Sequence, residues 1–294
     1  MLLINIIKEM RVKQYTKNFF IYAATLFSGN IFNLNILRLT TEAFVAFSLA
    51  ASIVYILNDI VDKEKDKQHP KKCHRPIASG KISIKLAMVL ICIFLLISIY
   101  ISYNINAILS IIILIYLIMN ILYSWKLKHI VIIDVMIIAI GFVLRALAGV
   151  IVINSGTTTW FILCVFMLSL FLAIGKRRAE MKLFVESIGN TRKVLEQYSV
   201  QLLDQLLIIV TAMTLTSYSL FAIQMTYAHE YILGEELSYM MITIPIVVYG
   251  MFRYLYLIYI KNLGEAPDEI LLKDKYIWMT LVLYIFCVIC IRSL

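Results

Sequence analysis

The chain has 294 residues, of which 62% are apolar and 15% are charged. Soluble domains contain about 45–50% apolar and about 25% charged residues, so this composition excludes the soluble globular, disordered and disulfide-rich classes. The formal net charge of +9 does not indicate a nucleic-acid partner, because excess Lys and Arg in a membrane chain first reports its orientation. The composition predicts an all-α, polytopic membrane protein with room for about nine spanning helices of roughly 20 residues.

The positions of the predicted spans follow from apolar runs that are bounded by charged or turn residues. The first run is the weakest, because Ser28, Gly29 and three asparagines interrupt it. No sequence repeat and no linker rich in Gly, Pro or Ser divides the chain, so we expect one integral-membrane domain over residues 1–294. The nine predicted transmembrane helices lie at about 19–37, 41–61, 84–102, 105–124, 130–153, 159–175, 205–227, 239–260 and 276–292.

The basic residues are distributed unevenly between the two sides that nine spans define. With the N-terminus in the cytoplasm, the inner segments hold all 27 Lys and Arg residues except Arg38, Arg145 and Arg292. Cytoplasmic loops of membrane proteins are enriched in Lys and Arg, so this bias supports nine spans. We therefore expect a multi-pass protein of the plasma membrane whose active site faces the cytoplasm.

Four polar residues close the second predicted span: Asn58, Asp59, Asp62 and Asp66. At steps of three and four residues, these side chains share one face of a helix. Like charges this close repel one another, and ionisable groups near hydrocarbon are costly unless they are compensated. Mg²⁺ is a suitable compensating cation, because it takes one or two carboxylates and completes its octahedron with waters and phosphate oxygens.

The residues around this cluster leave an alternative open. The acids alternate with Lys63, Lys65 and Lys67, which is also typical of a solvated helix end. The next segment contains Lys71 and Arg75, and cations beside carboxylates suit a metal-bound diphosphate. The downstream cations therefore favour a metal and diphosphate site.

The order of these residues resembles that of a known family. The run NDxxDxxxD closes the second span and HPxKxxRPIASG follows it, as in the UbiA superfamily of intramembrane prenyltransferases. The resemblance implies a UbiA-like helical bundle in which this run binds Mg²⁺ and the diphosphate of the donor. On the resemblance, Asp59, Asp62 and Asp66 are catalytic metal ligands, and Asn58, Lys71 and Arg75 contact the substrate.

The second acidic motif of that family is incomplete in this chain. Asp134 follows the fourth span, but Ile138 occupies the position where the family commonly has a second Asp. This departure weakens the case for a donor of the ordinary prenyl diphosphate kind. Arg145 lies about 20° off the helix face of Asp134 and roughly 16 Å further along the axis. An Arg this deep in a span indicates a functional site, or else a structural pairing with another span.

Further blocks between residues 11 and 275 resemble one branch of the superfamily, the decaprenyl-phosphate phosphoribosyltransferases. In chain order, the blocks are RxKQxxKN near the N-terminus, YSxxLK before Asp134, GFxLRAxAG and GKRxAE. The last block consists of RY, GxAPxE and a following Asp. Val12 and Tyr15 depart from the residues that are more common at the start of the branch. The resemblance implies that 5-phosphoribosyl 1-diphosphate is the donor and a polyprenyl phosphate the acceptor, in the synthesis of a cell-envelope glycolipid precursor.

Such a reaction brings several phosphate groups to the inner face and needs many cations there. We expect Tyr123, the catalytic Asp134 and Arg145 to shape the ribose or acceptor pocket. One alternative is a UbiA-type prenyltransferase that moves an isoprenyl group from a prenyl diphosphate to an aromatic acceptor; another is a transporter. The sequence leaves open whether the chain forms a homo-oligomer. The predicted phosphate ligands are Lys17, Lys71, Arg75, Lys128, Lys176 and Arg177.

Overall fold

The structure is a computed structural model, and it describes residues 2–68, 72–154, 158–186, 193–225, 229–232, 235–261, 270 and 274–293. Nearly all of these residues are helical. The contacts group the chain into two compact units, and the expectation of a single domain stays a prediction. Unit 1 comprises Met1–Thr25, Phe32–Trp125 and Leu144–Asn154, and unit 2 comprises Leu26–Ile31, Lys126–Val143 and Ser155–Leu294.

Eight helices in the described part of the chain are long and apolar enough to cross a membrane. They confirm the prediction of an all-α, multi-pass bundle, although the predicted count was nine. They span Leu34–Val61, Ile84–Ile105, Ala107–Trp125, Ile133–Ile153, Thr159–Lys182, Val200–Gln224, Tyr239–Tyr259 and Lys275–Ser293.

The missing span is the first one, at 19–37, which does not form one helix. The short helix α2 (Phe20–Phe27) is followed by a turn at Gly29, whose φ of 74° is a conformation that glycine adopts readily. After the 3-10 helix η2 (Asn30–Phe32), the side chain of Asn33 accepts hydrogen bonds from two backbone N–H groups and so caps the next helix. The same polar residues that weakened the predicted span therefore divide it.

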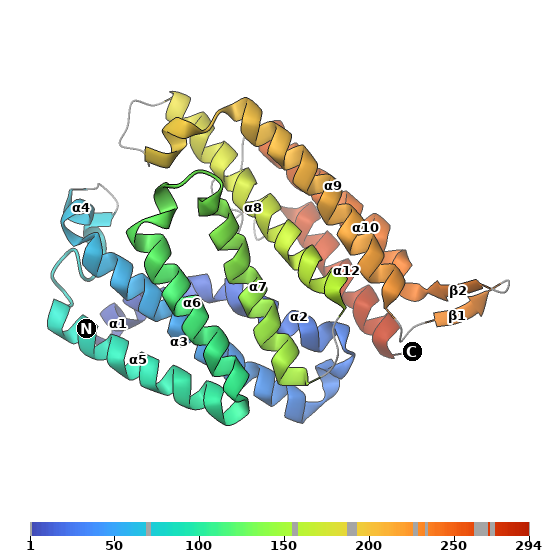
Figure 1. Cartoon of the computed structure of the whole chain (residues 1–294), viewed down its shortest axis with the longest axis horizontal. Helices are drawn as coiled ribbons and strands as arrows, with labels where there is room; N and C mark the ends of the chain where they lie inside the picture. The colour runs from blue at the N-terminus through green and yellow to red at the C-terminus, as the bar shows by residue number, and fades with distance from the viewer. Residues whose placement is uncertain are drawn as a thin grey trace. The chain divides into compact units, whose positions relative to one another are not determined.

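Unit 1 is built around α3 (Leu34–Val61), which packs against α5 (Ile84–Ile105) and α6 (Ala107–Trp125). Figure 1 shows these three helices side by side. Ala43, Ala46 and Ala50 are fully buried on α3, and small residues let membrane helices approach closely. The hydroxyl of Ser98 on α5 donates a hydrogen bond to the Ala46 carbonyl at 2.8 Å, which joins the two helices.

The N-terminal segment of unit 1 packs on α3. It consists of α1 (Leu2–Met10) and the 3-10 helix η1 (Val12–Phe19), and both contact α3. The C-terminal half of α7 (Ile133–Ile153) also belongs to this unit. A Cβ atom on Gly149 of α7 would lie 2.0 Å from the Ile21 carbonyl oxygen, so only glycine permits this close approach of the two backbones.

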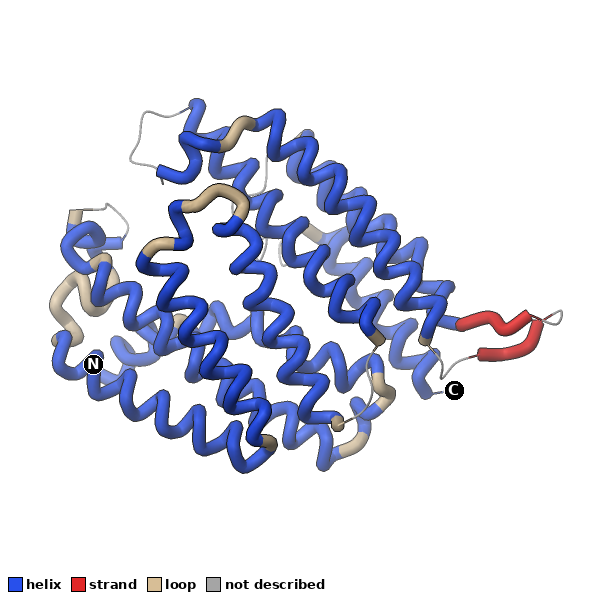
Figure 2. The backbone as a smooth tube through the Cα atoms, in the orientation of Figure 1, coloured by secondary structure: helices blue, strands red, loops and turns tan. Residues whose placement is uncertain are grey.

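Unit 2 contains α8 (Thr159–Glu186) and α9 (Val200–Gln224), which pack along one another (Figure 1). Helix α10 (Ile244–Tyr259) packs against α9 and α12 (Lys275–Ser293). An antiparallel hairpin that the sequence did not predict, drawn in red in Figure 2, is formed by β1 (His229–Ile232) and β2 (Glu235–Ser238). The unit also contains the first part of α7, up to Val143, and the 3-10 helices η4 (Leu127–His129), η5 (Lys193–Gln197) and η6 (Tyr239–Thr243).

Candidate functional site

The acidic residues that close α3 fold into a compact cluster with Arg75. Helix α3 ends at Val61, and the short helix α4 (Lys63–Lys67) follows Asp62. Asp59 and Asp66 are only 2% and 3% exposed. One nitrogen of Arg75, Nη1, donates to Asp59 Oδ1 at 2.9 Å and to Asp66 Oδ2 at 2.6 Å. Arg75 follows the 3-10 helix η3 (Lys72–His74), so a loop brings the cation back to the end of α3.

Three of the residues predicted from the motif contact one another in the structure, and two others do not join them. Asp59, Asp66 and Arg75 form one hydrogen-bonded group. Asn58 and Asp62 are half-buried, and neither side chain has a hydrogen-bond or ion-pair partner among the described residues. Their assignments to substrate and metal stay predictions, and Lys71 lies outside the described residues.

Arg11 brings a second cation to Asp59. Its guanidinium pairs with Asp59 Oδ1 and lies 5.0 Å from the ring centre of Tyr55. The Arg11 backbone has φ 52° and ψ 50°, a left-handed conformation that costs energy in residues other than glycine. The strained turn joins α1 to η1 and aims the side chain at Asp59. The sequence singled out Arg11 as part of a family block, but its partner lies 48 residues away.

Hydrogen bonds hold this N-terminal segment against α3. The Tyr15 and Ser52 hydroxyls are bonded at 2.8 Å, and Ser52 also donates to the Met10 carbonyl at 3.1 Å. Burial raises the pKa of Tyr15 above its usual value, so its hydroxyl stays protonated at neutral pH. These bonds fix the position of the chain on either side of Arg11.

Glu9 is a third buried acid beside this cluster, and sequence analysis missed it. The residue is 1% exposed, and neither carboxyl oxygen has a hydrogen-bond partner in the described part of the chain. Burial, and then the charge of Asp59, raise the pKa of Glu9 to about 8. A single acid within a basic N-terminal segment gives no sequence signal of such a position.

These acids fit a Mg²⁺ ion that completes its coordination with substrate. Asp59 and Asp66 both reach one nitrogen of Arg75, and Glu9 supplies carboxyl oxygens that have no hydrogen-bond partner within the described ranges. Over the ranges that the structure describes, no set of three or more Asp, Glu, His or Cys side chains forms a ready metal site. Mg²⁺ is commonly bound by one or two carboxylates together with waters and substrate phosphates, and the donors present match that pattern.

A second acidic cluster, in unit 2, surrounds Asp134. Asp134 is fully buried. Its Oδ2 accepts a hydrogen bond from Arg177 Nε at 2.7 Å, and its Oδ1 accepts one from the Tyr198 hydroxyl at 2.8 Å. The backbone N–H of Ile132 donates to the Tyr198 oxygen at 2.7 Å, and Arg177 also pairs with Glu180 at 2.5 Å. Both oxygens of Asp134 are therefore occupied by protein donors.

Tyr198 is the member of this cluster that sequence analysis missed. It follows η5 and lies 64 residues from Asp134. Burial raises the pKa of Tyr198 well above its usual value, so the phenol remains a donor at physiological pH. Its hydrogen bonds fasten the segment after η5 to the start of α7. The predicted roles of Asp134 in catalysis and of Arg177 in phosphate binding stay predictions.

Arg145 forms a separate buried group within unit 1. Its Nε donates to Asn18 Oδ1 at 2.7 Å and its Nη2 donates to the Tyr116 hydroxyl at 3.0 Å. The guanidinium lies 4.8 Å from the Tyr116 ring centre and 5.3 Å from that of Phe47, distances typical of cation–π contacts. Asn18 also donates to the Ser48 hydroxyl on α3 at 2.9 Å. These contacts support the structural alternative for Arg145, whose place in a substrate pocket stays a prediction.

The remaining predicted residues lie on several elements. Lys17 lies on η1 and Tyr123 near the end of α6, while Lys128 lies on η4 and Lys176 precedes Arg177 on α8. All four are half-buried. Their roles as substrate contacts stay predictions.

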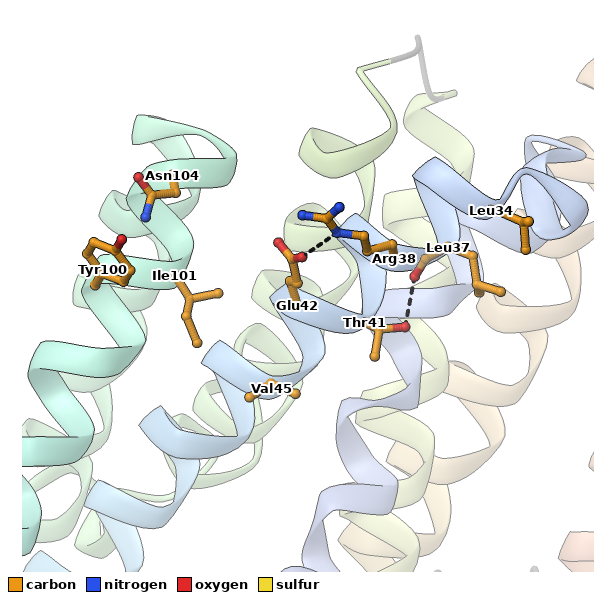
Figure 3. A pocket seen from close by; sticks show the side chains of 9 residues that line it. All are labelled: Leu34, Leu37, Arg38, Thr41, Glu42, Val45, Tyr100, Ile101 and Asn104. Atoms are coloured by element: carbon orange, nitrogen blue, oxygen red, sulfur yellow. Dashed lines mark hydrogen bonds and ion pairs between the residues drawn. The ribbon is translucent and has the colours of Figure 1, made fainter.

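A pocket of about 540 Å³ lies between α3 and α5 at the opposite end of α3 from the acidic cluster (Figure 3). Arg38 and Glu42 form an ion pair at 2.8 Å in its wall, and apolar side chains make up most of the rest. Asp59 lies about 31 Å further along the helix than Arg38. The pocket is therefore distinct from the acidic cluster. Its lining residues are Leu34, Leu37, Arg38, Thr41, Glu42, Val45, Tyr100, Ile101 and Asn104.

Sequence comparison finds relatives over almost the whole chain. The model of the UbiA prenyltransferase family matches residues 18–279. A decaprenyl-phosphate phosphoribosyltransferase of Corynebacterium glutamicum is 32% identical over 287 residues, which cover 96% of this chain and 85% of the relative. The protein of that name from Mycolicibacterium smegmatis is 32% identical over 286 residues, covering 95% of this chain and 90% of the relative.

Solved structures share the fold at lower identity. A UbiA homologue from Archaeoglobus fulgidus, bound to GPP and Mg²⁺, is 18% identical with a TM-score of 0.72, and the match covers 99% of this chain and 100% of the other. A digeranylgeranylglyceryl phosphate synthase is 21% identical with a TM-score of 0.68, over 100% of this chain and 99% of the other. The chain thus shares the helical fold of these solved structures.

Proposed function

Because the chain belongs to the UbiA prenyltransferase family and is a membrane-embedded transferase, we propose that it transfers a 5-phosphoribosyl group from 5-phosphoribosyl 1-diphosphate to a polyprenyl phosphate. The observation that carries this proposal is the 32% identity, over nearly the whole chain, to two relatives named for such a transfer. An oxygen of the acceptor phosphate forms the bond to ribose C1, and the bond from C1 to the diphosphate oxygen breaks. The products are polyprenylphosphoryl-5-phosphoribose and diphosphate.

The cluster around Asp59 supports this proposal because it combines acids with arginines. Arg11 and Arg75 present guanidinium groups, which match the geometry of phosphate oxygens. In the reaction they would exchange their carboxylate partners for the diphosphate of the donor. Mg²⁺ held by Asp59 together with a second acid of this cluster would supply positive charge to the departing diphosphate. The acceptor phosphate is already an anion, so the transfer needs no dedicated general base.

The membrane setting of the reaction follows from the same proposal. Apolar side chains are exposed along the outer faces of α5 and α6, where the isoprenoid chain of the acceptor would meet the protein from the bilayer. The asymmetric distribution of Lys and Arg supports a cytoplasmic location for the acidic cluster at the end of α3. We place the reaction at the plasma membrane, in the synthesis of a cell-envelope precursor.

The test uses the purified full chain in lipid nanodiscs that contain polyprenyl phosphate. Donor labelled in its ribose is added with and without Mg²⁺, and the label in the organic extract is measured. We expect label in the lipid fraction only when Mg²⁺ is present. If all label stays in the aqueous phase while a labelled prenyl diphosphate alkylates an aromatic acceptor, the chain is a prenyltransferase of the ordinary kind.

A further inference from the structure

Glu9 stands out in unit 1 because its charge has no partner. The residue lies on α1, outside the acidic motif, and is 1% exposed. Neither of its carboxyl oxygens accepts a hydrogen bond from any residue that the structure describes. Buried polar atoms in native proteins are nearly always hydrogen-bonded, and an exception calls for an explanation such as a ligand or ion that binds there.

The charged groups around Glu9 indicate what kind of ligand would bind beside it. Asp59 is its neighbour and the source of the strongest charge interaction on it. Arg11 pairs with Asp59, and Arg75 pairs with both Asp59 and Asp66. Two guanidinium groups therefore lie beside three buried carboxyl groups. If Glu9 also ionised, the three acids would carry one negative charge more than the two arginines neutralise. A further cation would compensate this excess.

The hydrogen bonds of the two arginines occupy only one oxygen of Asp59. Both arginines donate to Oδ1, and the Glu9 carboxyl group lies within hydrogen-bonding reach of the Asp59 carboxylate. Glu9 and Asp59 therefore bring carboxyl oxygens that neither arginine occupies into one place. Oxygen donors from two carboxylates are what Mg²⁺ takes from a protein before waters and phosphate oxygens complete its octahedron.

We propose that Glu9 and Asp59 together bind the divalent cation, so that α1 supplies a ligand that the motif at the end of α3 does not contain. In this arrangement Arg75 neutralises Asp66, and Arg11 shares Asp59 with the cation. The inference rests on the proposed function only in taking this cation to be the one used in the transfer. It makes the N-terminal segment part of the metal site.

The experiment measures cation binding directly, by electron paramagnetic resonance of Mn²⁺ with the purified full chain and no organic substrate. Titrations are run with and without inorganic diphosphate. We expect Glu9→Gln to weaken Mn²⁺ binding at least tenfold, since it removes a charged ligand but keeps the shape of the side chain. Glu64→Gln is the matched control, because Glu64 lies on α4 and pairs only with Lys67 at the surface, and it should bind Mn²⁺ as the wild type does.

Glu9→Gln also separates the proposal from a purely structural role. An amide resembles a protonated carboxylic acid, so a Glu9 that is only a buried neutral acid would leave Mn²⁺ affinity unchanged in the variant. Without metal, the variant should unfold at no lower temperature than the wild type, because it loses an unpartnered acid. Glu9→Asp keeps the charge on a shorter side chain and should bind Mn²⁺ more tightly than Glu9→Gln.

The outcomes distinguish this proposal from the proposed function. Wild-type Mn²⁺ affinity in Glu9→Gln, together with weakened binding in Asp59→Asn, would overturn the role of Glu9 and leave the motif as the metal site. Absence of Mn²⁺ binding by the wild type, even with diphosphate, would overturn both. Equal affinity of Glu9→Asp and Glu9→Gln would show that the carboxylate is not a ligand.

Discussion

Asp59 in unit 1 and Asp134 in unit 2 are both buried and both paired with arginine, yet their surroundings differ. Each oxygen of Asp134 accepts a hydrogen bond from a protein donor. At Asp59, both arginines share one oxygen, and the oxygens of the neighbouring Glu9 are buried without a donor of normal hydrogen-bond geometry among the described residues. Burial beside an arginine therefore does not by itself identify a catalytic acid. Acceptor oxygens without donors are the more informative feature, because they indicate where a cation can bind.

The largest expected effect is at Asp59. Asp59→Asn should lower the rate of lipid labelling roughly 100- to 1,000-fold, since removal of one group that stabilises developing charge typically costs that much. The measurement is the initial rate in nanodiscs, with Glu64→Gln as the control of similar charge change at the surface. Retention of more than a tenth of the wild-type rate would contradict the role of Asp59, and the helix content by circular dichroism shows whether the variant is folded.

The corresponding change at Asp134 should act on stability. Asp134→Asn leaves the buried Arg177 without this carboxylate, and breaking a buried ion pair costs about 3–5 kcal/mol of unfolding free energy. Denaturant unfolding in detergent measures the loss. Mn²⁺ affinity should stay at the wild-type value, and a tenfold decrease would mean that the two clusters are not as different as their hydrogen bonds indicate.

A smaller effect is expected at Tyr198, whose hydroxyl closes the Asp134 cluster. Tyr198→Phe leaves Asp134 Oδ1 and the Ile132 N–H without this partner, and an unsatisfied buried group costs about 1–3 kcal/mol. The same unfolding assay should therefore show a loss below that of Asp134→Asn. An unchanged unfolding free energy would mean that the Asp134 cluster does not depend on Tyr198.

The smallest expected effect is at Asp274, a partly exposed acid that accepts hydrogen bonds from Arg253. These bonds hold the pKa of Asp274 below its usual value of 3.8. A depressed pKa contributes stability above the unfolded-state value, and this stability is lost as the pH falls through the lower folded value. Asp274→Asn should thus melt below the wild type at neutral pH. The difference should begin to shrink below about pH 3.8 and vanish once the pH is under the lower folded pKa, and a difference that persists in stronger acid would exclude the carboxylate as its source.

The sequence predicted the parts of the fold and site that depend on neighbouring residues. Apolar runs located α5 and α6 closely. The acidic motif pointed to Asp59 and Asp66, but Asp66 lies on α4 and meets Asp59 through Arg75 rather than on one helix face. The prediction of one spanning helix at 19–37 was wrong, because a turn at Gly29 and a helix cap at Asn33 interrupt this apolar run. Short-range patterns therefore indicate the elements, whereas polar residues decide where an apolar run breaks.

Contacts between distant residues could not be predicted from one sequence. The pairing of Arg11 with Asp59 spans 48 residues, and that of Tyr198 with Asp134 spans 64. Glu9 had no visible partner in the sequence, because its position depends on how α1 packs against α3. Arg145 was singled out for its depth in a span, but only the structure shows that it binds Asn18 and Tyr116.

The hydrogen bond between Arg145 and Asn18 also has a consequence for the order of biogenesis. It joins residues that are 127 positions apart in the chain, and Gly149 meets Ile21 one helical turn further on. At a synthesis rate of about 5–20 residues per second, the N-terminal segment leaves the ribosome roughly 6–25 s before its partner on α7. The contacts of Asn18 and Ile21 with α7 therefore form only after α7 has been made, whereas Arg11 can meet Asp59 as soon as α3 is in place.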